Sequence, residues 1–307
     1  MKAMSTPARL LAILGIALSL SAPLIAGTEE PAAAAPAPAA SRFHLLTKLE
    51  VSDKYLTPRG MIVQNEGVTI QPLVLGMIDL YDNPGAFLSD ITLVGGVWCD
   101  YATEGIPEGL GPDSSDTNFI EIDPIFGISL GLGKNFKLDV TYTAFAMQIL
   151  DIGTSHHLET KLSYDDTDLL GAFALHPYLL FWKELDGKAT AAANFGVDES
   201  YYFEVGIAPG VKLGSVKLEA PIRVVLPASD FYGETFASSS TVGLYEVGLK
   251  ATIPISMPEG YGFWNAYIGV RYMDFVDDNL KHLANGGGFG PVTDDTAQVY
   301  AGISVFF

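Results

Sequence analysis

The sequence predicts an all-β protein: a transmembrane up-and-down antiparallel β-barrel of about 12 strands, preceded by a signal peptide and a Pro/Ala-rich linker. Three features favour this fold class. Apolar and polar residues alternate along many segments, short and long connections alternate between those segments, and the chain ends on an apolar strand. The alternative is a soluble β-sandwich whose last strand lies at the centre of a sheet.

The terminal segment 298–307 has the period of a strand with one apolar face. Phe307, Val305 and Ile303 belong to that face, and the alternate positions are mostly small or polar. A soluble protein rarely leaves the edge of such a strand unprotected, whereas a closed barrel has no edge. We expect Phe307, Val305 and Ile303 to form the insertion signal that the barrel-assembly machinery reads, a role implied by resemblance to outer-membrane proteins in general.

The N-terminal part has the features of an exported chain. Residues 1–26 carry Lys2 and Arg9 before an apolar run that ends near Ala26, which is typical of a signal peptide. Residues 27–41 form an Ala/Pro-rich, low-complexity linker. Residues 42–307 are expected to form one barrel domain, and no later stretch has the apolar length of a membrane-spanning helix.

Alternation and turn residues predict about twelve strands. They are expected at 44–51, 67–80, 87–101, 118–132, 136–148, 156–164, 169–182, 200–211, 216–226, 242–255, 261–273 and 297–307. The connections after the second, fourth, sixth, eighth and tenth strands are short, and most of the others are longer. Such parity is typical of an outer-membrane barrel with periplasmic turns, external loops and both termini in the periplasm. The architecture of a soluble β-sandwich does not require short and long connections to alternate.

Most strands have one charged and one apolar face. A Lys or Arg that faced lipid at mid-bilayer would cost about 2–4 kcal/mol, so the charged faces are expected to line the lumen. The predicted pore lining is Glu121, Asp123, Lys137, Asp139, Glu159, Lys161, Glu204, Lys217, Glu219, Arg223, Glu246, Lys250 and Arg271. This set either selects solutes or fills a narrow barrel with paired charges. For the second strand, with Leu73, Leu75 and Met77 opposite other apolar residues, periodicity assigns no face.

Aromatic residues near strand ends are typical of the girdles at membrane interfaces, although a few of them could instead be lumenal. The candidates are Tyr81, Trp98, Tyr101, Trp182, Tyr202, Trp264 and Tyr272.

We expect no catalytic, cofactor or metal site. Ser129 and Ser163 lie on predicted strands without a recognisable Ser/His constellation, and the chain has no Gly-x-Ser-x-Gly elbow. His157 and Glu159 share a strand face and could form a metal pair, an alternative that we do not favour. His176 is interpreted as a polar residue of the lumen or the interface.

The charge is strongly negative, with 17 Lys and Arg against 36 Asp and Glu, while 49% of the residues are hydrophobic. Such a charge argues against nucleic acid as a partner. Acidic residues gather in the long connections: Glu104, Glu108, Asp113, Asp116, Asp198, Glu199, Asp230, Glu234, Asp274, Asp277, Asp278, Asp294 and Asp295. We interpret them as a hydrated surface beside lipopolysaccharide; the alternatives are divalent-cation bridging and a preference for cationic solutes.

One part of the chain resembles a known family. The segments Leu49-Glu50-Val51-Ser52-Asp53-Lys54-Tyr55, Arg59-Gly60, Glu66-Gly67-Val68-Thr69-Ile70-Gln71-Pro72 and Gly95-Gly96-Val97-Trp98 resemble the TorF-like conserved hypothetical outer-membrane proteins. The resemblance covers about the first quarter of the exported chain. It implies a barrel in a Gram-negative-type outer membrane, with transport as the suspected activity and no catalytic residues.

These observations predict a porin-like protein of the cell outer membrane: a passive channel or transporter for small solutes with a mixed-charge lumen. The alternative is a non-conducting structural or surface-interaction barrel with acidic external loops. An outer-membrane lipid hydrolase is the third hypothesis. The expected partners are outer-membrane lipid and lipopolysaccharide, the barrel-assembly machinery, and small solutes or divalent cations at the acidic loops.

Overall fold

The structure is a computed structural model that describes residues 41–104, 118–148, 154–186, 199–233, 236–285 and 290–307. The predicted signal peptide and nearly all of the predicted linker lie outside these ranges. Among the residues that it describes, no helix is long and apolar enough to cross a membrane.

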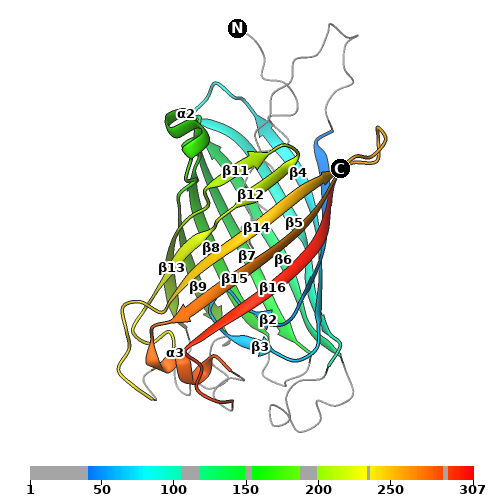
Figure 1. Ribbon diagram of the computed structural model, residues 1–307. Helices are drawn as coiled ribbons and strands as arrows, with labels where there is room; N and C mark the ends of the chain where they lie inside the picture. Colours follow the sequence, from blue (N-terminus) through cyan, green and yellow to red (C-terminus); the bar gives the residue numbers. More distant parts are fainter. Residues whose placement is uncertain (1–40, 105–117, 149–153, 187–198, 234–235, 286–289) are drawn as a thin grey trace, which may run out of the picture.

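The described chain forms a closed antiparallel barrel of 12 strands, which confirms the predicted fold class (Figure 1). The barrel segments are β1 (Phe43–Ser52), β4 (Thr69–Asp82), β5 (Leu88–Ala102), β6 (Phe119–Leu132), β7 (Phe136–Met147), β8 (Ser155–Tyr164), β9 (Tyr178–Asp186), β10 (Tyr201–Ile207), β11 (Gly210–Leu213), β12 (Val216–Glu219), β13 (Ile222–Pro227), β14 (Leu244–Ile255), β15 (Phe263–Phe275) and β16 (Asp295–Phe306). Pro209 separates β10 from β11, and Pro221 separates β12 from β13, because proline offers no N–H to the ladder. Each pair of segments makes up one barrel strand.

The barrel closes between its first and last strands. Leu46 of β1 pairs with Phe306 of β16, and Ser52 pairs with Tyr300. Beyond the strand, Phe307 donates its N–H to the Leu45 carbonyl at 2.9 Å and accepts the Leu45 N–H at 3.2 Å. The apolar terminal strand is therefore covered on both edges, by β1 and by β15.

The two ends of the barrel differ (Figure 1). β1 begins and β16 ends at the same end, which we call the terminal end. The opposite end, which we call the loop end, carries the connection 53–68 with the hairpin β2 (Tyr55–Leu56) and β3 (Ile62–Gln64), and the helix α3 (Asp278–Leu283). The strand boundaries lie within two residues of those predicted for most barrel strands.

The prediction was wrong for the connection between β8 and β9. The strand expected at 169–182 begins only at Tyr178, and the residues before it form α2 (Thr167–Leu170) and the short 3-10 helix η2 (Gly171–Phe173). The Asp166 carboxylate accepts the N–H of Leu175 at 3.0 Å and that of His176 at 2.9 Å. Burial alone would raise the pKa of Asp166, but these N–H groups hold it below its ordinary value. The buried side chain thus ties residues 166–176 into a compact connection.

Alternate residues of each strand face the lumen and the outside. On β14, Val247 and Leu249 are 47% and 54% exposed, whereas Glu246 and Lys250, which flank them, are buried. This alternation places the apolar face outside and the charged face inside. The faces of β4, ambiguous in the sequence, resolve in the same way: Leu73, Leu75 and Met77 are buried inside the barrel. They pack there with Leu46, Val94, Ile125 and Phe306.

Three strand glycines lie under tyrosine rings. A Cβ at Gly269 would approach the Tyr300 ring to 2.4 Å, and one at Gly302 would come equally close to the Tyr267 hydroxyl. A Cβ at Gly206 would approach the Tyr178 ring to 2.3 Å. Glycine is needed at these positions because the rings cover the backbone of the neighbouring strand.

Candidate functional site

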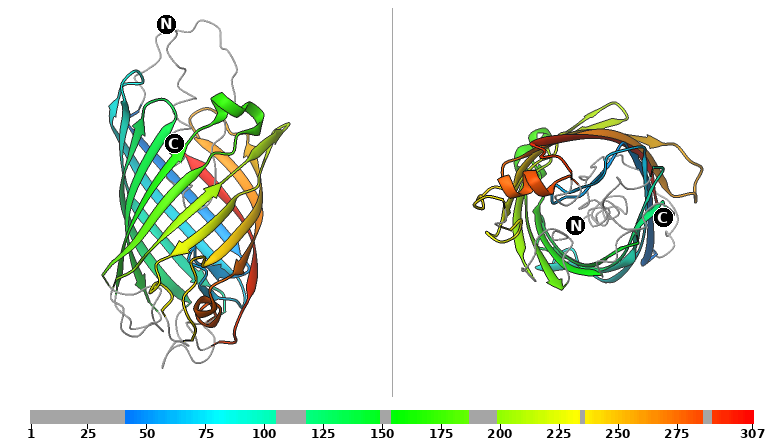
Figure 2. Two further views of the ribbon diagram at one scale, coloured as in Figure 1. Left: turned by 90° about the vertical axis from the view of Figure 1, so that its left-hand side faces the viewer. Right: turned by 90° about the horizontal axis from the view of Figure 1, so that it is seen from below.

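The connection 53–68 folds into the lumen, and the end-on view in Figure 2 shows it inside the ring of strands. Its contacts reach opposite walls of the barrel. The Tyr55 hydroxyl donates to Glu121 of β6 at 2.6 Å, and Arg271 of β15 donates to the Leu56 carbonyl at 2.7 Å. We call residues 54–64, with β2 and β3, the lumen hairpin.

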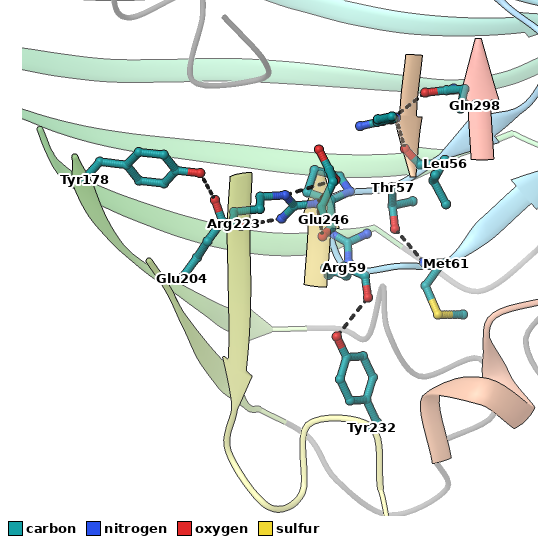
Figure 3. A network of polar contacts seen from close by, with 12 residues as sticks. Leu56, Thr57, Arg59, Met61, Tyr178, Glu204, Arg223, Tyr232, Glu246 and Gln298 are labelled. Carbon is teal, nitrogen blue, oxygen red and sulfur yellow. Dashed lines mark hydrogen bonds and ion pairs between the residues drawn. The ribbon is translucent and has the colours of Figure 1, made fainter. Parts of the chain in front are cut away.

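Side chains of the barrel hold the lumen hairpin by its carbonyl groups (Figure 3). Besides Arg271, Arg223 of β13 donates to the Pro58 carbonyl at 2.9 Å. Tyr232, from the connection between β13 and β14, donates to the Arg59 carbonyl at 2.8 Å, and Gln298 of β16 donates to the Lys54 carbonyl. The hairpin carbonyls therefore find donors on the walls instead of water.

The hairpin turns tightly at Gly60. This residue has φ +92, a conformation that favours glycine, and a Cβ there would approach Leu244 Cδ2 to 2.8 Å. The turn is closed by the Thr57 N–H to the Met61 carbonyl at 2.9 Å, and by the Met61 N–H to Thr57 Oγ1 at 3.0 Å.

An apolar core surrounds one side of the hairpin. The side chains of Leu56, Met61 and Ile62 are buried. They belong to a cluster with Leu180, Trp182, Tyr202, Val225, Phe231, Tyr232, Leu244, Met273, Phe275, Leu280, Leu283 and Ala284. Full burial of a Leu, Ile or Met side chain is worth about 1.5–3 kcal/mol, so these three side chains stabilise the hairpin in its folded-in position.

Arg59 at the tip is buried among aromatic rings. Its guanidinium lies 4.9 Å from the ring centroids of both Phe145 and Trp182, which is a cation–π arrangement. His157 stacks on the Trp182 ring at 4.5 Å and contacts the Phe145 ring at 4.2 Å. Trp182, Tyr202 and Trp98 are therefore lumen residues and not members of an interfacial girdle; the lumen hairpin gives them partners there.

Tyr55 makes a polar contact with the barrel wall on the side of β6. Burial, together with the negative charges of Glu121 and Asp123, raises the pKa of Tyr55 well above its ordinary value. The hydroxyl therefore stays a donor to Glu121. Asp100, next to Glu121 across the β5–β6 ladder, accepts a hydrogen bond from Gln71 at 2.8 Å.

All residues of the predicted pore lining lie on the inward face of the barrel, where most of them are buried. Arg223 binds Glu246 at 2.6 Å and also pairs with Glu204, which accepts the Tyr178 hydroxyl at 2.6 Å. Contacts of further members are Glu121 with the Tyr55 hydroxyl at 2.6 Å, Lys137 with Asp139 at 3.3 Å, Lys217 with Glu219 at 2.5 Å, Lys250 over Tyr267 at 4.6 Å, Lys161 over Tyr178 at 4.2 Å, Arg271 with Gln298 at 2.5 Å, and Asp123 with the Ala146 N–H at 3.3 Å. Glu159 lies on the inward face of β8. Their role as a pore lining stays a prediction.

The three residues of the predicted insertion signal lie at the C-terminal end of β16. Ile303 and Val305 lie on the outward face of β16, and Phe307 is half-exposed beside Leu45 of β1. Their recognition by an assembly machinery stays a prediction.

Several acidic residues of the loop end have structural partners. Asp277 accepts the N–H groups of Asn279 and Leu280 and so caps α3, whereas Asp230 accepts the Ser200 hydroxyl. Glu199 pairs with Lys183 at 3.3 Å, and Asp278 pairs with Lys281 at 2.7 Å. Glu104, Asp274, Asp294 and Asp295 are also described, whereas Glu108, Asp113, Asp116, Asp198 and Glu234 lie outside the described residues.

Among the described residues, His157 and Glu159 do not belong to a group of three or more closely spaced metal ligands. In the described part of the chain, the group whose ligand atoms lie within 4.8 Å of one another is Asp165, Asp166 and His176. His157 instead shares a hydrogen bond of 2.9 Å with Ser155, and both side chains are buried beneath the aromatic cluster. Sequence reasoning missed this Ser/His pair, although its i, i+2 spacing on a strand was a visible signal.

Comparisons with known proteins reach the fold level. No family profile and no curated protein matches the chain. Among solved structures, outer membrane phospholipase A from Escherichia coli is 11% identical, with 85% of this chain and 89% of that one covered and a TM-score of 0.42. The COG4313 outer membrane channel from Pseudomonas putida F1 is 11% identical, covers 91% of this chain and 100% of its own, and has a TM-score of 0.45. The CymD monoaromatic hydrocarbon channel is 9% identical, with 86% and 87% covered and a TM-score of 0.39. These similarities concern the barrel fold alone.

Proposed function

We propose that the chain is a small-solute channel of the bacterial outer membrane, closed at rest by the lumen hairpin. The observation that carries this proposal is the way in which the hairpin is held. Side chains of the barrel wall donate to its carbonyl groups, while β2 and β3 pair with each other and, through Ile62, with Asn285. The hairpin can therefore leave the lumen without breaking a ladder between barrel strands.

The membrane location is part of the same proposal. Apolar side chains cover the outer face of the barrel strands, and lipid is the solvent that such a surface requires. A closed barrel satisfies its backbone polar groups internally, as the hydrocarbon region demands. We infer that the terminal end faces the periplasm and that the acidic loop end faces outward.

A specific observation favours a second candidate, a non-conducting structural barrel. Arg223 is buried and pairs with two buried carboxylates, Glu204 and Glu246, as expected for charges that fill a lumen. In this case the lumen hairpin would be a permanent part of the interior, and the acidic loop end would carry the function.

Lipid hydrolysis is the least favoured function. On the outer wall, His156 shares a hydrogen bond of 2.6 Å with Tyr142, which is no acyl-transfer nucleophile in this setting. Ser155 and His157 are the described Ser/His pair, and both are buried inside the barrel. We propose that the protein is not an enzyme; a phospholipid-hydrolysis assay on the refolded barrel tests this.

Removal of the lumen hairpin is expected to open the channel. We would replace residues 54–65 by a Gly/Ser linker and record single-channel conductance in a planar bilayer beside the intact protein. The matched control replaces residues 105–116, an equally long part of the sequence between β5 and β6. We expect steady conductance from the hairpin variant and little from the intact and control proteins.

The outcomes separate the two candidates. A folded, heat-modifiable hairpin variant without conductance would reject the channel in favour of the structural barrel. A steady conductance of the intact protein that the deletion leaves unchanged would reject the hairpin as the gate.

A reversible lock is the second test of the gate. Ile62 and Asn285 are bridge partners, so their Cα atoms lie within reach of a disulfide. In a Cys99→Ala background, Ile62→Cys with Asn285→Cys is expected to abolish openings of the intact channel when oxidised and to restore them on reduction. The single variant Asn285→Cys should respond to neither treatment; openings that continue in the oxidised double variant would contradict gating by the hairpin.

A further inference from the structure

The connection between β8 and β9 presents an exposed apolar surface at the terminal end. Phe173 is 83% exposed and Leu169 is 72% exposed, and α2 contains no buried residue. The end-on view of Figure 2 draws this helix, in green, outside the ring of strands. Its apolar side chains therefore do not contribute to the lumen or to the core.

The polar groups of the same connection have partners within the protein, although of its three aspartates only Asp166 is buried, whereas Asp165 and Asp168 are exposed. The Asp166 carboxylate is buried against the N–H groups of Leu175 and His176. Asp168 pairs with Lys134 of the neighbouring turn, and Asp165 accepts the Thr167 N–H at 3.0 Å. The arrangement satisfies the polar groups locally and leaves the leucines and Phe173 directed outward.

This surface continues into the outer wall of the barrel. η2 packs beside β11, where Val211 and Leu213 are 49% and 57% exposed. Phe136, at the start of β7, is also exposed and packs on Tyr164, the last residue of β8. The apolar surface of α2 and η2 is thus the rim of the larger apolar surface that the strands present to lipid, and a water-exposed patch of this kind is unusual on a protein surface.

We propose that residues 167–175 are an interfacial anchor that binds phospholipid of the periplasmic leaflet, with Leu169, Leu170 and Phe173 inserted at the boundary between headgroups and acyl chains. A short helix with one apolar face and satisfied polar groups suits that depth. The anchor sets how deep the terminal end of the barrel sits in the membrane. The proposal rests on the membrane location proposed above, but not on channel activity.

The test measures lipid contact at single labelled sites. In a Cys99→Ala background, Phe173→Cys is labelled with an environment-sensitive nitrobenzoxadiazole fluorophore, and the protein is refolded into phosphatidylcholine/phosphatidylglycerol vesicles. Quenching by a nitroxide attached near the lipid headgroup is compared with quenching by aqueous iodide. We expect the label at position 173 to lose most of its emission to the shallow lipid nitroxide and little to iodide.

Two matched sites make the result decisive. Asp168→Cys, on the polar side of the same helix, is expected to show the reverse pattern. Leu249→Cys, on the outer face of β14, reports whether the barrel spans the membrane and should be quenched by a nitroxide deep in the acyl chains. Iodide quenching at 173 with lipid quenching at 249 would overturn the anchor and indicate a surface for a soluble protein. Loss of lipid quenching at both 173 and 249 would reject the membrane location itself.

Discussion

Replacement of Arg223 by methionine is expected to lower the free energy of unfolding by about 3–5 kcal/mol, because removal of one partner leaves buried charges uncompensated. Arg223 is buried, and its guanidinium binds both Glu204 and Glu246. It also donates to the Pro58 carbonyl of the lumen hairpin. The substitution therefore destabilises the lumen network and loosens the hairpin together. Urea unfolding of the refolded protein, followed by tryptophan fluorescence, measures the loss.

Two further variants isolate the cause. Lys212→Met removes an exposed charge from β11 and is expected to change the stability by less than about 0.5 kcal/mol. Adding Glu204→Gln and Glu246→Gln to Arg223→Met should recover a large part of the loss, because the glutamines need no cation. A single Arg223→Met variant as stable as the parent would show that this buried network is not held by its arginine.

Substitution of Gly302 by alanine is expected to destabilise the barrel by about 3 kcal/mol, at the upper end of ordinary overpacking. A Cβ there would lie 2.4 Å from the Tyr267 hydroxyl and 2.5 Å from the Leu49 carbonyl oxygen. The tyrosine can move, but Leu49 belongs to β1, and its backbone moves only if the β1–β16 ladder separates. The heat-induced mobility shift of the folded barrel on denaturing gels measures the change.

Gly85→Ala is the matched control, because no atom lies within 4 Å of a Cβ at that turn position. We expect it to leave the transition unchanged. A double variant, Gly302→Ala with Tyr267→Ala, should remain destabilised, since the clash with the Leu49 carbonyl persists. Full recovery in the double variant would assign the effect to the tyrosine and not to the closing ladder.

The errors in prediction have local physical causes. The residues Asp165-Asp166-Thr167-Asp168 predict a tight turn, and the apolar run after them predicts a strand. The Asp166 side chain instead binds backbone N–H groups nine and ten residues away. Such a contact depends on the path of the connection, so no periodicity reveals it. The aromatic residues Trp182 and Tyr202 were ambiguous for a similar reason: a strand end can face a girdle or a folded-in loop.

The sequence by itself determined the fold class, most strand boundaries and the inward face of the charged residues. These properties follow from a period of two and from the energetic penalty for charges in lipid, which act on every strand separately. Only the tertiary structure decided that the connection 53–68 enters the lumen, which residues it meets there and which lumen charges pair. These contacts join residues far apart in the chain, such as Arg223 and Pro58 or Tyr55 and Glu121. They arise once closure of the barrel brings its opposite walls within reach of one loop.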